Sequence, residues 1–161
     1  MKKILITGGC GFIGSHIVEY FHDKHKSAEI VVFDKITYAA SVNNLSRIKK
    51  SKRLKIVKKD ILNFKILKKN IENCELVIHA AAESHVDNSF QLNDKFIKTN
   101  VLGTKNVMQA CKINKVKKII HISTDEIYGE IFRGSFKEND KFNPSNPYSS
   151  SKAAAEMIVN G

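Results

Sequence analysis

Two adjacent carboxylates, Asp125 and Glu126, follow Thr124 at the end of the apolar run 119–123. If this run is a strand, the pair stands at its carboxyl end, where doubly wound α/β sheets bind their ligands. Unequal environments can separate two neighbouring carboxylates into one acid and one base. The alternative is a pair of surface charges on a loop, and the residues alone favour neither interpretation.

Tyr148 and Lys152 are separated by three serines. On a helix, positions i and i+4 lie on one face, so we expect the ammonium of Lys152 beside the phenol, where it would lower the pKa of Tyr148 toward neutrality. Such a tyrosine can take a proton from a substrate hydroxyl during hydride transfer. A tyrosine and a lysine at this spacing are common by chance, so the pair needs support from a second motif.

That support comes from the segment Thr-Gly-Gly-Cys-Gly-Phe-Ile-Gly at residues 7–14, which lies between an apolar run and a helical pattern. We expect Gly8 to permit a tight turn, Gly11 to let the backbone approach a pyrophosphate, and Gly14 to let the helix pack close to the sheet. Free N–H groups at the helix start would hold the phosphates. The strand–turn–helix context indicates dinucleotide binding rather than a structural turn.

Asp34 follows the apolar run 30–33, twenty residues beyond Gly14. A carboxylate there can accept hydrogen bonds from both ribose hydroxyls and repels a 2′-phosphate, so it favours NAD over NADP. The adjacent Lys35 weakens that preference.

Asp60 follows a third apolar run, 54–57. We expect it to accept a hydrogen bond from the adenine amino group, with Ile61 packing against the ring. The alternative is that Asp60 caps a helix.

Apolar runs alternate with helical patterns along the chain. We expect strands over 4–6, 30–33, 54–57, 76–80 and 119–123, helices over 12–24, 94–114 and 149–159, and a loop over 137–148. Unbroken apolar strands are typical of sheets covered by helices on both faces. The pattern predicts an α/β fold with a doubly wound parallel sheet, the Rossmann fold, without an internal repeat or a domain boundary.

Composition excludes several protein classes. The chain has 161 residues, of which 42% are hydrophobic and 27% charged, as in a soluble globular protein of one domain. The longest apolar runs, of about seven residues, are too short to span a membrane, and the N-terminus lacks a signal sequence, so we expect a cytoplasmic protein. Cys10, Cys74 and Cys111 form no pattern typical of disulfides or metal sites.

The formal net charge is +11, and eleven basic residues with one acid lie between Arg47 and Lys69. Such a cluster could bind RNA. RNA-binding surfaces usually interleave aromatic residues for stacking, however, and only Phe64 is available here. We favour a solvated lysine-rich face, and keep a basic RNA-binding module as the non-enzyme alternative.

Taken together, the motifs resemble those of the extended short-chain dehydrogenase/reductases, and within them the nucleotide-sugar 4,6-dehydratases, most closely those acting on dTDP-glucose. The segments that carry the resemblance follow in family order from Thr7 to Glu156: TGGCGFIGS, DKITYAAS, AAAESHVDNS, TNVLGT, STDEIYGE and NPYSSSKAAAE. TDE is the most specific, because sugar epimerases have a serine and a neutral residue there. UDP-glucose 4,6-dehydratases share HVDNSF and YGE, so UDP-glucose is an alternative substrate, and a nucleotide-sugar C4 epimerase is a further alternative.

The resemblance implies NAD as cofactor, a nucleotide-diphosphate-glucose substrate and no metal. It implies that Asp125 is the general acid, that Glu126 is the general base, and that Thr124, Tyr148 and Lys152 act at the C4 hydroxyl. Ser84 and Thr124 would contact the sugar. Cofactor contacts are implied for Gly8, Gly11, Phe12, Ile13, Gly14, Asp34, Lys35, Ile36, Thr37, Asp60, Ile61, Ala80, Ala81, Ala82, Glu83, Ser84, Thr99, Tyr148 and Lys152.

The matched segments correspond to the first part of a family member. We therefore expect residues 1–161 to be an incomplete NAD-binding Rossmann domain without the C-terminal nucleotide-sugar-binding lobe, and to be inactive alone. We expect the full-length protein to be a homodimer that binds neither nucleic acid nor membrane. For His85 and Asp87 we expect a structural role.

Overall fold

The computed structural model describes residues 1–161, and these divide into two compact units. The sheet unit comprises residues 1–81 and 106–122, and the helical unit comprises residues 82–105 and 123–161. The length predicts one domain, whereas the contacts within the chain separate these two parts.

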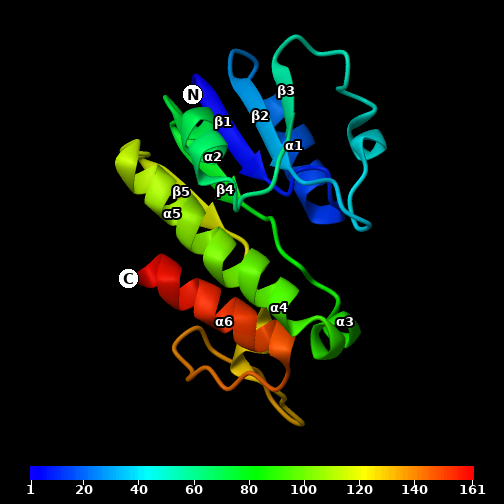
Figure 1. The fold of residues 1–161 in the computed structure, drawn as a ribbon, viewed down its shortest axis with the longest axis vertical. Coiled ribbons are helices and arrows are strands. Elements are labelled where there is room, and N and C mark those ends of the chain that lie inside the picture. Colours follow the sequence, from blue (N-terminus) through cyan, green and yellow to red (C-terminus); the bar gives the residue numbers. More distant parts are fainter. The chain divides into compact units, whose positions relative to one another are not determined.

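The sheet unit contains five parallel strands in the order β3-β2-β1-β4-β5 (Figure 1). Their bounds are β1 Lys3–Thr7, β2 Glu29–Asp34, β3 Leu54–Lys58, β4 Leu76–His79 and β5 Lys118–His121. All five predicted strands are present, although β4 and β5 end one and two residues earlier than expected. The parallel sheet confirms the predicted Rossmann-like α/β fold.

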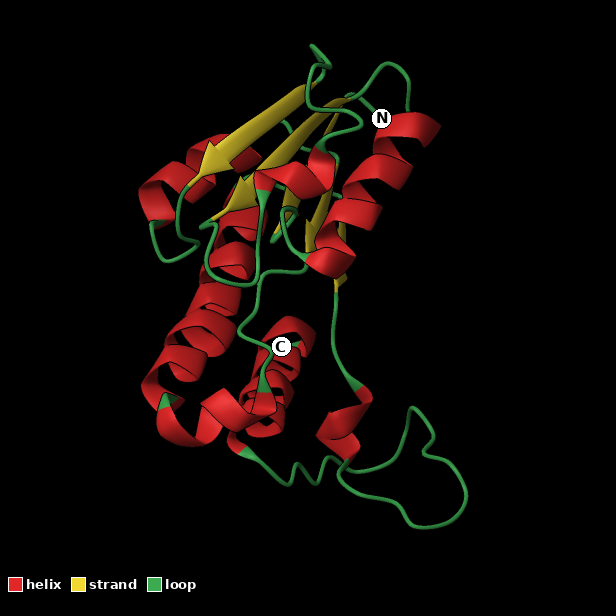
Figure 2. Cartoon of the chain, turned by 90° about the vertical axis from the view of Figure 1, so that its right-hand side faces the viewer, coloured by secondary structure: helices red, strands yellow, loops and turns green.

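Helices cover both faces of this sheet (Figure 2). One face packs against α1 (Phe12–Lys24) and the 3-10 helix η1 (Val42–Leu45). The other packs against α2 (Phe64–Ile71) and the part of α5 (Thr104–Ile113) that belongs to this unit. Successive residues of the central strands alternate between the two cores, so nearly every position in these strands is buried and apolar.

The helical unit contains the remaining elements. They are α3 (Val86–Gln91), α4 (Asn93–Phe96), the π-helical segment η2 (Ile97–Gly103), the 3-10 helix η3 (Asp125–Tyr128) and α6 (Pro147–Asn160). Helix α6 packs against α3, α4 and η2. A long loop without regular structure joins η3 to α6 (Figure 2).

Three predictions about helices are corrected. Helices α2 and α3 were not predicted, because each is short and α2 carries several lysines around the buried Leu67 and Ile71. The helix expected over 94–114 is interrupted by the π-helical segment, which the 3.6-residue hydrophobic period does not reveal. Helix α6 begins at Pro147 instead of Ser149, so Tyr148 lies inside it rather than in the loop.

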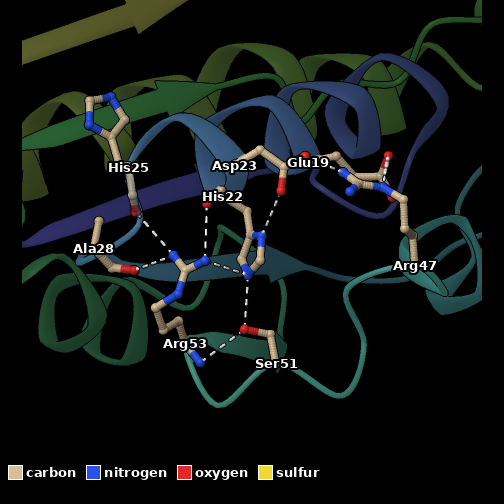
Figure 3. A network of polar contacts seen from close by, with 8 residues as sticks. All are labelled: Glu19, His22, Asp23, His25, Ala28, Arg47, Ser51 and Arg53. Atoms are coloured by element: carbon tan, nitrogen blue, oxygen red, sulfur yellow. Dashed lines mark hydrogen bonds and ion pairs between the residues drawn. The ribbon is translucent and has the colours of Figure 1, made fainter.

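Two arginines of the basic cluster have structural roles in the sheet unit (Figure 3). Arg53 donates hydrogen bonds to the carbonyl oxygens of His22, His25 and Ala28, where α1 ends. It also contacts Nε2 of His22, which in turn lies 2.8 Å from the Ser51 hydroxyl. A guanidinium at a helix C-terminus satisfies carbonyls that have no partner in the helix.

Arg47 forms ion pairs with Glu19 and Asp23 on α1, at 3.2 and 2.8 Å. Lys55 and Lys58 are exposed on β3, an edge strand of the sheet. Lysines on an edge strand oppose pairing with another chain. These placements support the interpretation of the cluster as a solvated face.

Replacing Arg53 by Met is expected to lower the free energy of unfolding by about 2 kcal/mol, because charged hydrogen bonds to partly buried carbonyl groups are lost. Urea unfolding followed by circular dichroism measures the change. Lys52→Met, at an exposed neighbouring position, should stay within about 0.5 kcal/mol of the parent. Equal stabilities of the two variants would contradict the role given to Arg53.

Candidate functional site

The glycine loop after β1 has the conformation expected of a dinucleotide-binding turn. Gly8 has a φ of +68°, and a Cβ there would lie 2.7 Å from the backbone of Ala81. Both observations explain why a side chain is excluded at this position. The expected role of Gly8 in a tight turn is supported.

Close packing of the helix against the sheet, which was expected to depend on Gly14, depends on Gly9. A Cβ on Gly9 would lie 2.9 Å from the side chains of Val18 on α1 and Val32 on β2, so its absence lets helix and sheet approach. A Cβ on Gly14 would instead collide with the carbonyl oxygen of Gly8. The absence of a side chain at Gly14 therefore lets the backbone of the glycine loop, at Gly8 and Gly9, lie directly against the first turn of α1. The only sequence signal for Gly9 was its position within the glycine motif.

Gly11 is the N-cap residue of α1, and no side chain caps this helix. The first N–H groups of a helix have no acceptor within it. The nearest atoms to a Cβ on Gly11 are carbonyl oxygens at 3.4 and 3.9 Å, so the protein itself leaves room for a side chain. Phe12 and Ile13 are 78% and 58% exposed. The start of α1 is thus suited to receive a diphosphate.

Asp34 is buried at the end of β2 and holds the glycine loop. Its Oδ2 accepts a hydrogen bond from the N–H of Cys10 at 2.8 Å, and its Oδ1 accepts one from the N–H of Ile36 at 2.7 Å. Ile36 has a φ of +56°, which is strained for a β-branched residue. Each carboxylate oxygen has a further lone pair, so Asp34 retains the capacity to accept hydrogen bonds from ribose hydroxyls.

Asp60 forms an ion pair with Lys35, with 2.7 Å between Oδ2 and Nζ, and its Oδ1 accepts a hydrogen bond from Leu62 N–H. The alternative interpretation of Asp60 as a helix cap is wrong, since Asn63 is the N-cap of α2. The ion pair engages Lys35, which reduces its availability to a 2′-phosphate. Ile61 is 4% exposed and packs into the core, which leaves little of its side chain for an adenine ring.

The parallel topology brings the cofactor candidates of the sheet unit to one edge. The glycine loop follows β1, residues 34–37 follow β2, Asp60 and Ile61 follow β3, and Ala80 and Ala81 follow β4. The carboxyl ends of parallel strands form one edge of the sheet, which is where dinucleotides bind. The other cofactor candidates, Ala82, Glu83, Ser84, Thr99, Tyr148 and Lys152, belong to the helical unit.

In the helical unit, Thr124 connects the carboxylate pair to Tyr148. Its hydroxyl oxygen accepts a hydrogen bond from the N–H of Glu126 at 3.3 Å and donates to Oδ1 of Asp125 at 3.4 Å. It also forms a hydrogen bond with the Tyr148 hydroxyl. Asp125 is exposed and Glu126 is half-buried. The structure therefore places three predicted catalytic residues around a fourth, Thr124, with different environments for the two carboxylates.

The expectation that Lys152 lowers the pKa of Tyr148 toward neutrality is wrong in this structure. Burial raises the pKa of Tyr148, the hydrogen bond with Thr124 opposes this, and the charges of Glu126 and Asp125 add to the rise. Lys152 is 5% exposed. Burial lowers the pKa of Lys152 to about 8, although the Glu156 carboxylate opposes this. Spacing on a helix indicated proximity but could not include the effect of burial.

Two polar residues that lie within the segments TNVLGT and NPYSSSKAAAE, but were given no role from the sequence, order this region. Asn100, 1% exposed, accepts a hydrogen bond from Glu83 N–H and donates to the Glu83 carbonyl and to the Ser151 hydroxyl. Glu156 accepts a hydrogen bond from the Ser123 hydroxyl. A polar residue within an apolar helical pattern was the available signal for Asn100.

Several smaller features complete the helical unit. Thr99 is half-buried in the π-helical segment, and Ser84 is exposed. His85 is the N-cap residue of α3, without a side-chain capping hydrogen bond, and Asp87 lies in the first turn of this helix. A cavity of about 650 Å³ contains none of the predicted site residues and is lined by Asn93, Ile97, Val101, Pro144, Ser145, Asn146, Pro147, Ser150, Ser151 and Ala154.

The structure contains no helix that is both long and apolar enough to cross a membrane. No group of three or more His, Cys, Asp or Glu side chains is arranged to hold a metal ion. All three cysteines are buried free thiols, and burial raises the pKa of each, to about 12 for Cys10 and Cys111 and about 11 for Cys74.

Comparison with known proteins identifies the relatives of this chain. A family model described as GDP-mannose 4,6 dehydratase matches residues 5–161. The chain is 44% identical to dTDP-D-glucose 4,6-dehydratase of Dictyostelium discoideum, in a match covering 99% of this chain and 40% of that protein. It is 40% identical to a trifunctional UDP-glucose 4,6-dehydratase, 3,5-epimerase and reductase of Arabidopsis thaliana, covering 98% of this chain and 24% of that one.

Among solved structures, the dTDP-glucose 4,6-dehydratase DesIV of Streptomyces venezuelae superposes with a TM-score of 0.94 and 37% identity. The match covers 98% of this chain and 50% of that one, which was solved with NAD and TYD bound. The chain thus spans half or less of the length of each of these three proteins.

Proposed function

The chain belongs to the GDP-mannose 4,6-dehydratase family, and from this premise we propose that it carries the cofactor-binding and catalytic residues of a nucleotide-sugar 4,6-dehydratase. The reaction is the conversion of dTDP-glucose to dTDP-4-keto-6-deoxyglucose and water. Proteins named for dTDP-glucose are 38 to 44% identical to this chain and one named for UDP-glucose is 40% identical, so identity alone does not choose the nucleotide. We take dTDP-glucose as the first candidate because DesIV, which superposes with a TM-score of 0.94, is a dTDP-glucose 4,6-dehydratase.

The residues of the sheet unit fit NAD. The uncapped start of α1 suits the diphosphate, and Asp34 suits the adenosine ribose because its two oxygens retain lone pairs. The ion pair of Lys35 with Asp60 favours NAD over NADP. When bound, NAD would accept the hydride of the sugar C4 and later return it to C6.

The residues of the helical unit supply the proton transfers. Tyr148 takes the proton of the C4 hydroxyl, while Thr124, its hydrogen-bond partner, holds the same oxygen. Burial raises the pKa of Tyr148, so this role requires the positive charge of bound NAD, which would favour the phenolate. The resulting ketone acidifies the C5 proton, which Glu126 removes. The C6–O bond breaks, and Asp125 protonates the departing hydroxyl, so that one molecule of water leaves. Glu126 returns its proton to C5 as the hydride reaches C6, and the proton taken by Tyr148 restores the acid form of Asp125. Lys152 orients the phenol from the same helix.

One observation carries this proposal: the carboxylate of Asp125 and the phenol of Tyr148 both form a hydrogen bond with the Thr124 hydroxyl, and Glu126 is held beside them through its backbone N–H. The phenol of Tyr148 can accept a proton during an oxidation at C4. The carboxylates of Asp125 and Glu126 can act as acid and base in a loss of water. A C4 epimerase uses the first but has no use for the second, so the contacts favour a dehydratase.

Product analysis tests the proposal. A protein that includes the remainder of the family's length would be incubated with dTDP-glucose and UDP-glucose in parallel, and the products identified by mass spectrometry. Loss of water from either substrate supports the dehydratase. The substrate that reacts faster identifies the preferred nucleotide, thymidine or uridine. Formation of the galactose epimer without loss of water would instead identify an epimerase.

We further propose that residues 1–161 constitute the NAD-binding domain of the protein. The substrate nucleotide would then be held by the part of the protein that corresponds to the unmatched half of its relatives. Residues 1–161 alone should show no measurable dehydration, because binding energy from the nucleotide is needed to position the sugar. The full-length protein is proposed to be a homodimer.

Substitution of Gly11 by Val is expected to weaken NAD binding at least about tenfold, or roughly 1.4 kcal/mol, because a branched side chain would stand at the start of α1. The protein should remain folded, since the nearest atoms to a Cβ there are 3.4 Å away. Calorimetric titration with NAD measures the affinity, and circular dichroism verifies folding. Gly11→Ala should show a smaller loss, and undiminished affinity of a folded Gly11→Val variant would refute the cofactor site.

A further inference from the structure

Asn146 lies between the general base and the helix that carries the phenol. It is the N-cap residue of α6, and its Nδ2 donates a hydrogen bond to Oε2 of Glu126 at 3.2 Å. Its Oδ1 accepts a hydrogen bond from Ser149 N–H at 2.8 Å, while its own N–H donates to the Ser149 hydroxyl at 3.2 Å. One amide side chain therefore contacts both η3 and α6.

The chemistry of the two partners determines how this amide is oriented. An ionised carboxylate accepts hydrogen bonds, and a backbone N–H only donates them. Only the NH₂ group can therefore face Glu126, and only the oxygen can face Ser149. A flip of the Asn146 amide would lose both contacts, so the two partners hold it in one orientation.

The path along the chain between the two residues is long. Glu126 and Asn146 are twenty residues apart, and they are joined by the irregular loop between η3 and α6. A hydrogen bond from Asn143 N–H to the Ile127 carbonyl draws the ends of this loop together. That bond joins two backbone groups and does not contact the Glu126 side chain. The hydrogen bond from Asn146 is made to the carboxylate of Glu126 itself.

We propose that Asn146 is a positioning residue, which fixes the carboxylate of Glu126 relative to Tyr148 on α6. The inference rests on the proposed function, in which Glu126 removes the C5 proton. Asn146 touches neither the sugar nor the cofactor in this account and acts only through Glu126. The loss of water should depend on it, and the oxidation at C4 should not.

The choice of variants separates this role from helix capping. Ser, Asp and Asn are all effective N-caps, but only Asn combines an acceptor for Ser149 with a donor for Glu126. Asn146→Ser keeps the cap and removes the donor. Asn146→Asp keeps the cap and places a second carboxylate against Glu126. Asn143→Ser, at an exposed asparagine of the same loop, is the matched control.

The experiment uses the full-length protein in single-turnover reactions with dTDP-glucose, quenched and analysed by mass spectrometry. In Asn146→Ser the 4-keto sugar that still carries its C6 hydroxyl should accumulate, with the loss of water slowed about tenfold and C4 oxidation within about twofold of the parent. Asn146→Asp should slow the loss of water further and move the acid limb of its pH profile to higher pH, because two adjacent carboxylates share a proton. Asn143→Ser should match the parent.

Thermal unfolding gives a readout independent of turnover, and Asn146→Ser should unfold within about 2 °C of the parent. Unchanged loss of water in Asn146→Ser would overturn the inference. Equal slowing of C4 oxidation and loss of water would also overturn it, since that result indicates a capping role alone. Failure of the unmodified protein to dehydrate any nucleotide sugar would instead refute the proposed function.

Discussion

Replacing Glu126 by Gln in the full-length protein should reduce the formation of dehydrated product about 10²- to 10⁴-fold, the usual contribution of a general base. The substitution keeps the shape of the side chain but removes its ability to take the C5 proton. Thr124 and Tyr148, to which we assign the chemistry at C4, are unchanged, so oxidation at C4 should continue. The 4-keto sugar that retains its C6 hydroxyl should therefore accumulate, and quenched-flow mass spectrometry would detect it.

Glu130→Gln provides the matched control, because Glu130 is an exposed glutamate just beyond η3. This variant should form product at the parent rate. A normal rate of product formation by Glu126→Gln would remove the general-base role from Glu126. Loss of C4 oxidation in the same variant would show instead that Glu126 is needed for the first step.

The stability of residues 1–161 should depend on pH through Lys152. Its pKa is about 8 in the folded protein against the ordinary value of 10.5, because burial disfavours the ammonium. Between these values the unfolded state binds more protons than the folded state, so the free energy of unfolding rises with pH. The penalty for the buried charge is fully present below about pH 8 and is lost by about pH 10.5, a difference of about 3 kcal/mol.

Comparison with Lys152→Met isolates this contribution. The three buried thiols act in the opposite direction. Their pKa values are raised from the ordinary value of 9.0, so their contribution to stability is fully present below about pH 9 and is lost as the pH rises above it. They are common to parent and variant. Urea unfolding at about pH 7.5 and about pH 10 would give the four free energies required. The parent should gain stability relative to the variant on going to the higher pH. Parallel changes in the two proteins would show that Lys152 is not buried as an ammonium.

The apolar runs of the sequence were sufficient to predict the parallel sheet and the place of its five strands along the chain. Helices cover both faces of the sheet, so its central strands are unbroken apolar runs, and few other folds produce this pattern. The glycine loop, Asp34 and Asp60 were predicted to lie together for the same reason: each comes within three residues of the end of such a run, and parallel strands bring their carboxyl ends to one edge. Local spacing was therefore sufficient to predict where residues close to the end of a strand lie.

Features that depend on distant contacts became visible only in the folded chain. The π-helical segment leaves the hydrophobic period unchanged. The early start of α6 is set locally by Asn146 and Pro147, and the hydrophobic period does not report it either. The pKa of Tyr148 is raised although Lys152 stands one helical turn away, because burial outweighs the hydrogen bond with Thr124. Glu126 meets Asn146 across twenty residues of chain. Periodicity reports which face of an element is buried, but desolvation and long-range hydrogen bonds depend on what the folded chain brings to that face.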